Sequence, residues 1–251
     1  EHELPMEANL NQRAGPEVPP RERRLALSAV LPGIAVLFLW CIFLLDQGLE
    51  LSLYRYGIYP RTAEGLVGII TSPLVHGDME HLLNNSIPAF VLGGALLYFF
   101  PQLAGRVVIG AWLVSGIWVW ISARANYHIG ASGVVYGLAA FLFTSGILRK
   151  QRMLMGLALL VVFLYGSMLW GVFPLFPRIS WESHFWGAAA GVSMAYAYRK
   201  VPSAVHDPRE ITWEDEEDEP PAAQEEGTMD GAEDDEQGGR SWRSTNSWQR
   251  F

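Results

Sequence analysis

Long apolar segments separated by short polar ones dominate the chain between about residues 25 and 200. A helix that crosses a membrane needs about 20 mostly apolar residues. Six segments approach or exceed that length: residues 25–49, 81–100, 103–121, 132–148, 153–173 and 183–198. This pattern predicts an all-α polytopic membrane protein with six transmembrane helices. The fourth and sixth are short, so we expect them at the centre of the bundle, where neighbouring helices cover them.

Polar segments flank the apolar region on both sides. We expect residues 1–24 to form a polar N-terminal segment, residues 25–200 the membrane domain, and residues 201–251 an acidic, disordered tail. The N-terminal segment is charged and contains Pro, and no small-residue cleavage site follows the first apolar run, so we expect that run to be retained rather than removed as a signal peptide.

The net charge of −8 lies mainly in the tail and argues against nucleic-acid binding. The tail also carries Trp213, Trp242 and Trp248, which are unusual in a disordered segment. Two readings stay open for it: a solvated tail, or a segment whose tryptophans anchor a partner.

The positions of Lys and Arg predict how the chain is oriented in the membrane. With six spans, nine basic residues fall on one side, against four on the other. The nine are Arg21, Arg23, Arg24, Arg106, Arg149, Lys150, Arg152, Arg199 and Lys200, and the four are Arg55, Arg61, Arg124 and Arg178. This distribution favours cytoplasmic termini. The fourth and sixth spans then start from the outer face, which brings Ser132 and His184 to the same depth.

Six polar residues lie within these apolar segments or at their mouths. They are His81, Asn84, Asn85, Ser132, Glu182 and His184. A charged or strongly hydrogen-bonding group in a bilayer costs about 2.5 kcal/mol or more, so such a residue usually faces the bundle interior and marks function. A hydroxyl, two imidazoles and two carboxamides are together sufficient to build a hydrolase.

The second span begins with two polar groups on one helical face, since His81 and Asn85 are four residues apart. His76 lies just before it. A zinc site formed by His76, His81 and His184 is the alternative, but the chain has no H-E-x-x-H motif, and a spacing of five puts His76 and His81 on different faces. We therefore predict no metal and no cofactor.

The fourth span opens with the sequence Gly130-Ala131-Ser132-Gly133. The two glycines allow a tight turn and a close approach of substrate, and the N–H groups at a helix N-terminus suit a developing oxyanion. The nucleophile elbow of α/β-hydrolases is excluded, because it needs a preceding strand and a Gly where this chain has Val134.

In the sixth span, His184 is followed by Gly187 and Gly191 on one face, a spacing that favours close helix packing. Packing against the small residues of the fourth span would place His184 beside Ser132, with Tyr136 one turn further along and able to stack on the imidazole. A Ser hydroxyl needs an adjacent base. Glu182 points elsewhere on the helix, so the residues indicate a Ser–His dyad without a third member.

These motifs resemble those of the rhomboid family of intramembrane serine proteases: His76-x4-His81-x3-Asn85, Gly130-Ala131-Ser132-Gly133 and His184-x2-Gly187-x3-Gly191. The resemblance covers about residues 25–200. It implies that Ser132 is the nucleophile, that His184 is the general base, and that His81, Asn85 and the Ser132 backbone N–H form the oxyanion hole. It also implies supporting roles for His76, Gly130, Gly133, Tyr136, Gly187 and Gly191.

The segment between the first two spans, residues 50–75, departs from the family pattern. Many rhomboids carry a Trp-Arg pair there, where this chain has Leu66-Val67-Gly68, so the anchoring of the segment is open. Its three tyrosines, Tyr54, Tyr56 and Tyr59, favour the membrane interface, and an ordinary external loop is the alternative.

The resemblance implies single-span membrane proteins as substrates, and the compact six-span core without a recognised targeting signal leads us to expect a bacterial inner membrane as the location. Two other function classes compete with the protease. One is a catalytically silent rhomboid-like protein that binds membrane clients, and such proteins usually lack the Ser or the His. The other is a small transporter, which would carry polar groups on several spans and inverted repeats, and no repeat is present in this sequence.

Overall fold

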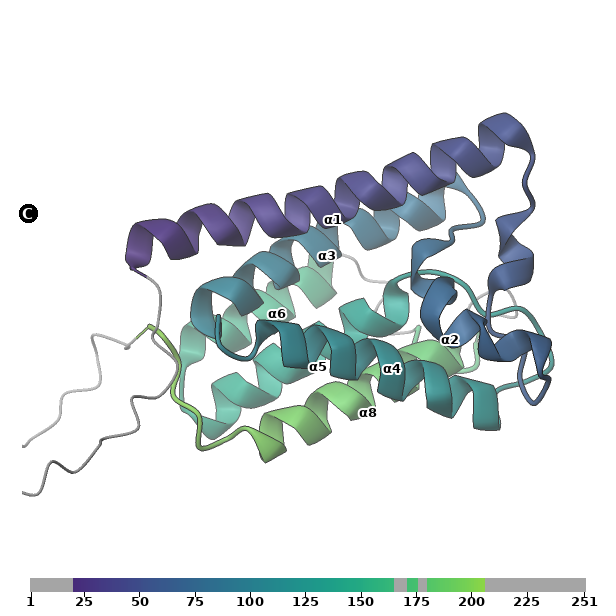
Figure 1. Cartoon of the computed structure of the whole chain (residues 1–251). Helices are drawn as coiled ribbons and strands as arrows, with labels where there is room; N and C mark the ends of the chain where they lie inside the picture. The colour runs from purple at the N-terminus through teal and green to yellow at the C-terminus, as the bar shows by residue number, and fades with distance from the viewer. Residues whose placement is uncertain (1–19, 165–170, 176–179, 206–251) are drawn as a thin grey trace, which may run out of the picture. The chain divides into compact units, whose positions relative to one another are not determined.

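The computed structural model describes residues 20–164, 171–175 and 180–205, and this part of the chain is built from helices and turns (Figure 1). The α-helices are α1 (Arg21–Leu49), α2 (Gly68–Thr71), α3 (Met79–Phe99), α4 (Ala104–Ser122), α5 (Ser132–Leu148), α6 (Arg152–Leu164) and α8 (Trp181–Ala197). Single turns of 3-10 helix lie at Leu53–Tyr56, Glu64–Leu66 and Ser72–Leu74. The prediction of an all-α polytopic membrane bundle is confirmed. Most of the tail, with its three tryptophans, and residues 1–19 lie outside the described residues.

The observed helices follow the apolar segments closely, with one exception. The fourth segment coincides with α5, and α1, α3, α4 and α8 begin or end within four residues of their predicted bounds. The fifth segment was expected to reach Phe173, but Gly171–Leu175 forms turns, so that prediction is wrong at its C-terminal end. Pro174 explains part of the difference, because a proline disfavours helical backbone at the residue before it, which is Phe173.

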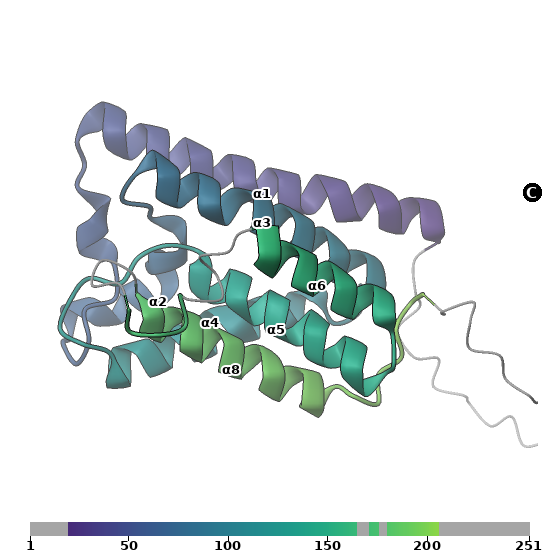
Figure 2. The same ribbon diagram turned by 180° about the vertical axis from the view of Figure 1, so that it is seen from behind.

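The helices differ in how they contribute to the bundle. The helices α1, α3 and α4 are long and apolar enough to cross a membrane, whereas α5 and α8 have 17 residues each, about 25 Å at 1.5 Å per residue. Most side chains of α5 are buried, while α1 exposes most of its apolar surface. Helix α1 packs along α3 (Figures 1 and 2). A buried helix can be short because protein, rather than lipid, surrounds it.

Glycines set the distance between α5 and α8. A Cβ atom added to Gly187 would collide with the Gly133 carbonyl, and one added to Gly191 would collide with the Gly137 carbonyl. On its other side α5 meets α4, where a Cβ on Gly137 would lie 2.6 Å from the Ala111 methyl group. Because the backbones touch, the first turns of α5 and α8 are held in a defined register.

The segment 50–75 is anchored to α4 by hydrogen bonds to backbone carbonyls. Trp112 and Trp120 of α4 donate their indole N–H groups to the carbonyls of Ile69 and Thr62, at 3.0 and 2.9 Å. In the opposite direction, Arg61 donates to the Ala123 carbonyl at 2.7 Å. A Trp and Arg set thus links the two elements here, although most of it lies on α4 rather than in the segment itself.

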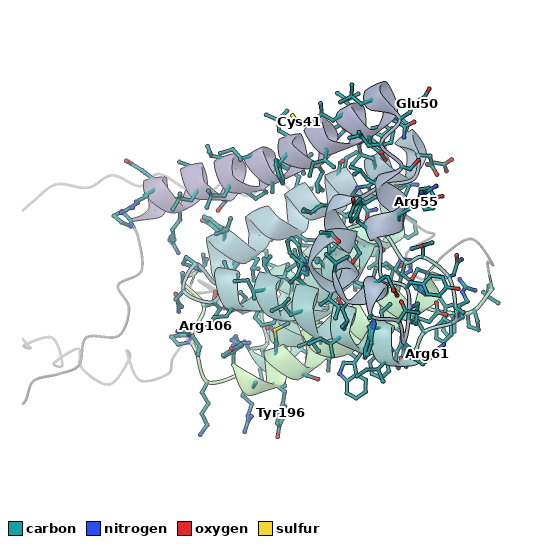
Figure 3. All side chains as sticks on the ribbon, turned by 45° about the vertical axis from the view of Figure 1, so that its right-hand side comes forward. Cys41, Glu50, Arg55, Arg61, Arg106 and Tyr196 are labelled. Atoms are coloured by element: carbon teal, nitrogen blue, oxygen red, sulfur yellow. The ribbon has the colours of Figure 1, made fainter. Side chains whose placement is uncertain are left out.

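Figure 3 locates this region at one end of the bundle: Arg55 and Arg61 lie at the end where α1 stops beside Glu50, and Arg106 lies toward the opposite end. Cys41 points away from the bundle on the outer side of α1 and is exposed.

Candidate active site

Three helices begin at the same end of the bundle and carry the polar residues predicted from the sequence (Figure 1). His81 lies in the first turn of α3, Ser132 is the first residue of α5, and His184 lies in the first turn of α8. The start of α3 is capped by Asp78, whose carboxylate accepts the His81 backbone N–H at 2.7 Å. The cap fixes where the helix begins and hence where the His81 ring points.

A cavity of about 530 Å³ lies between these helix starts. Five of the predicted site residues line it: His81, Asn85, Ser132, Tyr136 and His184. Other lining residues, including Asp78, Glu80 and Asn84, are exposed, so water can enter from this end. Ser132 and His184 are buried within it, with 9% and 8% of their surfaces exposed.

The imidazole of His184 is held on two sides. Its Nδ1 lies 2.8 Å from the carbonyl oxygen of Gly171, and its ring stacks on Tyr136 with centroids 4.1 Å apart and planes 9° apart. A carbonyl only accepts hydrogen bonds, so Nδ1 carries the proton. In the neutral ring the lone pair then lies on Nε2, which is the atom available as a base.

The Ser132 hydroxyl makes no hydrogen bond within the described part of the chain. It lines the same cavity as His184, and close packing of α5 on α8 brings the two helix starts together. Hydrogen bonds between a nucleophile and its base are often long before substrate binds and tighten in the complex. The geometry therefore fits a dyad whose hydrogen bond forms as the substrate enters.

The opposite wall holds candidate donors for an oxyanion. Asn85 donates one amide N–H to the His81 carbonyl at 3.0 Å, which leaves its second N–H for a ligand. Gly130 has a φ of +104°, and a Cβ there would collide with the His81 ring and lie 3.6 Å from Asn85 Nδ2. Only glycine allows the backbone to pass so close to these two side chains. The first N–H groups of α5 have no acceptor within their own helix.

His76 lies behind the cavity rather than in its wall. It is 2% exposed, its Nε2 accepts the Ala131 N–H at 3.4 Å, and its ring meets His81 edge to face at 5.1 Å. Burial lowers the pKa of His76 to about 3, so the ring is neutral at ordinary pH. In this position His76 supports the turn before Ser132 and the ring of His81.

The remaining predicted residues shape the packing around the site. Gly133, Gly187 and Gly191 form the contact between α5 and α8. Within residues 20–164, 171–175 and 180–205, no three His, Cys, Asp or Glu side chains come together as metal ligands would.

The sequence analysis missed several groups near the site. The Gly171 carbonyl carries no sequence signal, because every residue has one. His128 and Ser180 line the cavity and hydrogen-bond to each other at 2.5 Å. Glu182 was noticed as a polar residue in an apolar segment, but its partner Arg124, at 3.4 Å, lies 58 residues away in the sequence.

Comparison with known proteins agrees with this arrangement. The family model of the Rhomboid domain matches residues 63–201, which include every predicted site residue. The uncharacterized protein Rv1337 of Mycobacterium tuberculosis is 36% identical over 183 residues, which are 67% of this chain and 73% of that protein. The uncharacterized protein Mb1372 of Mycobacterium bovis matches to the same extent, and ML1171 of Mycobacterium leprae is 33% identical over 197 residues, 71% of this chain and 76% of its own length.

The fold and the apolar helices define an integral membrane protein with a polar cavity at one end of a helical bundle. The match of the Rhomboid domain to more than half of the chain shows that it belongs to the rhomboid family.

Proposed function

We propose that this chain is an intramembrane serine endopeptidase that cleaves transmembrane segments of other membrane proteins with a Ser132–His184 dyad. The observation that carries the proposal is the imidazole of His184. It lines the same cavity as Ser132, and its Nδ1 proton is directed to the Gly171 carbonyl, so Nε2 is left as a base. A Ser hydroxyl becomes a nucleophile only when such a base is beside it.

The reaction starts when an unwound stretch of a substrate helix enters the cavity. His184 Nε2 takes the Ser132 proton as Oγ attacks the peptide carbonyl. Negative charge then develops on the carbonyl oxygen, where Asn85, His81 and the Ser132 backbone N–H donate hydrogen bonds to it. His184 next protonates the leaving amine, and water entering past the exposed rim hydrolyses the acyl-enzyme.

The single-span substrates and the orientation follow from the membrane setting. The surplus of Lys and Arg near one end of the spans supports cytoplasmic termini and a cavity that faces the outer side of the membrane, which we propose to be a bacterial inner membrane. A substrate with one span can present a helix-destabilising stretch to this end of the bundle.

A second candidate is a rhomboid-like protein that binds membrane clients without cleaving them. The same cavity would then hold a client segment, and Ser132 would not be activated. The retained Ser132 and His184, together with the oriented imidazole, favour the protease.

Labelling with a fluorophosphonate probe tests the proposal. Purified protein in detergent should label covalently, and Ser132→Ala and His184→Ala should not. Ser193→Ala is the matched control, because Ser193 is an exposed hydroxyl on α8 that bonds only to the Ala189 carbonyl of its own helix. A folded parent protein that stays unlabelled would favour the client-binding function. Labelling retained in Ser132→Ala would refute the assignment of the nucleophile.

A further inference from the structure

A chain of hydrogen bonds joins the start of α8 to the loop that precedes α5. His128 lies in that loop and is 2% exposed. Its Nδ1 lies 2.5 Å from the Ser180 hydroxyl, and its Nε2 lies 3.1 Å from the Arg124 carbonyl. The Ser180 hydroxyl also lies 2.7 Å from the Ser183 hydroxyl. Three polar side chains and one backbone carbonyl are therefore linked one after another at the mouth of the cavity.

The direction of each hydrogen bond follows from its acceptors. The Arg124 carbonyl can only accept, so His128 carries a proton on Nε2. Burial lowers the pKa of His128, which keeps the ring neutral, so Nδ1 accepts from the Ser180 hydroxyl. The Ser180 oxygen then accepts from Ser183. The hydrogen bonds therefore all point the same way, from Ser183 through Ser180 and His128 to the Arg124 carbonyl.

A second link runs parallel to the first. The carboxylate of Glu182 lies 3.4 Å from the Arg124 Nε and accepts the Arg124 backbone N–H at 3.4 Å. Glu182 is 4% exposed. Its charge is thus paired with Arg124 at the point where α8 begins, and removing Arg124 would leave the Glu182 carboxylate buried without its partner.

Both links end at residues that closely precede His184 in the sequence: Ser180 and Ser183 in the first link, and Glu182 in the second. The Ser180 carbonyl accepts the backbone N–H of Ser183 at 3.1 Å and that of His184 at 3.4 Å. The Ser180 hydroxyl caps no backbone N–H of α8; it contacts the side chains of His128 and Ser183 instead. Through His128, the first turn of α8 is therefore tied to the loop that precedes α5.

The loop end of the links is fixed too. His128 exchanges two backbone hydrogen bonds with Ile58, at 2.9 and 3.0 Å. The same loop continues from Arg124 through Gly130 to Ser132, the first residue of α5. The links therefore connect the loop that leads into the nucleophile with the turn that carries the base.

We propose that His128, Ser180 and the Arg124–Glu182 pair form a clasp that positions His184 relative to Ser132. The proposal rests on the proposed protease function and assigns these four as positioning residues, since the hydrogen bonds described above link them to one another and to the backbone before His184. In most serine hydrolases a carboxylate orients the imidazole. Here the Gly171 carbonyl orients the ring, and the clasp holds the backbone from which the ring projects.

The test measures how fast the full-length protein in detergent reacts with a fluorophosphonate probe. Two quantities are obtained for each variant: the maximal labelling rate and the probe concentration at half that rate. For Ser180→Ala we expect the maximal rate to fall about 10- to 100-fold, because a misplacement of about 1 Å can cost 10²-fold, while the half-maximal concentration is unchanged. Ser180→Thr keeps the hydroxyl and should restore most of the rate. Ser193→Ala is again the matched control.

Two further variants separate a positioning role from a structural one. Glu182→Gln keeps the volume of the side chain and should also lower the maximal rate. The single variants His128→Asn and Ser180→Ala both break the hydrogen bond between His128 and Ser180. The maximal rate of the double variant should therefore fall no further than that of the slower single variant. Melting temperatures are recorded for all variants.

The outcomes are distinct. If the parent protein labels and Ser180→Ala and Glu182→Gln label at the parent rate, the clasp is refuted and the protease function stands. The clasp is also refuted if these variants only melt earlier while their folded fraction reacts normally. A folded parent protein that does not label refutes the protease function and the clasp together.

Discussion

A methyl group added at Gly191 tests whether the contact between α5 and α8 positions the proposed catalytic groups, Ser132 and His184. The Cβ of Gly191→Ala would overlap the Gly137 carbonyl oxygen, lying 2.9 Å from the carbonyl carbon and 3.0 Å from the Phe141 nitrogen. These neighbours are backbone atoms of a buried helix and cannot rotate away as a side chain could. The two helices must therefore separate locally.

The size of the effect follows from that overlap. To restore ordinary van der Waals contact, the two helices must move apart by about 1 Å, and overpacking of this kind typically lowers the stability by about 1–3 kcal/mol. A displacement of about 1 Å between reacting groups can lower a rate about 100-fold. We therefore expect Gly191→Ala to be less stable and to react with a fluorophosphonate far more slowly than the parent.

The control is an alanine placed where the helix has room. Gly156 lies inside α6, and among the residues that the structure describes a Cβ there would meet no atom within 4 Å. Gly156→Ala should leave labelling unchanged and stabilise the protein by about 0.5–1 kcal/mol, because alanine is the better helix former. Stability is measured by SDS titration in mild micelles. If Gly191→Ala and Gly156→Ala behave alike, the close contact does not position the site.

Four other changes have defined outcomes. Asn85→Ala should slow labelling about 10²- to 10³-fold if its free amide N–H serves the oxyanion. Tyr136→Leu removes the ring stacked on His184 and should slow labelling about three- to tenfold, matching the 0.5–1.5 kcal/mol of a stacked pair. Trp112→Phe loses the bond to the Ile69 carbonyl and should cost about 1 kcal/mol of stability by SDS titration. His76 has its pKa lowered from 6.5 to about 3, so the folded state cannot take up the proton that the unfolded chain binds below pH 6.5. As the pH falls from about 6.5 to about 3, the parent should lose about 1.4 kcal/mol of stability per pH unit relative to His76→Gln, seen in their melting temperatures.

The helices were predictable because lipid imposes a simple rule on the sequence. A span must be apolar over most of its length, so the apolar segments mark α1, α3, α4, α5 and α8 to within a few residues. The end of α6 was not predictable in this way, since the turns from Gly171 to Leu175 are as apolar as the helix before them. Hydropathy records burial in lipid or protein and does not report the backbone conformation.

The candidate site was predictable to the extent that its side chains are rare in apolar segments. Ser132, His184, His81 and Asn85 stand out by type and spacing, and the structure brings them to one cavity. The anchoring of the segment 50–75 could not be predicted, because Trp112 and Trp120 look like ordinary residues of an apolar span. Their role is visible only through the backbone carbonyls that they contact.

The Gly171 carbonyl suggests a physical reason for the missing third side chain. A carboxylate beside His184 would be another charge inside the bundle, where desolvation is expensive and a paired charge gains little. A neutral carbonyl fixes the same tautomer without that penalty. The consequence is that the ring depends on the backbone of the turn at Gly171 and on the start of α8. Changes at Ser180 or Glu182, which leave the proposed catalytic side chains Ser132 and His184 intact, should therefore affect the proposed reaction more than their distance from those side chains would suggest.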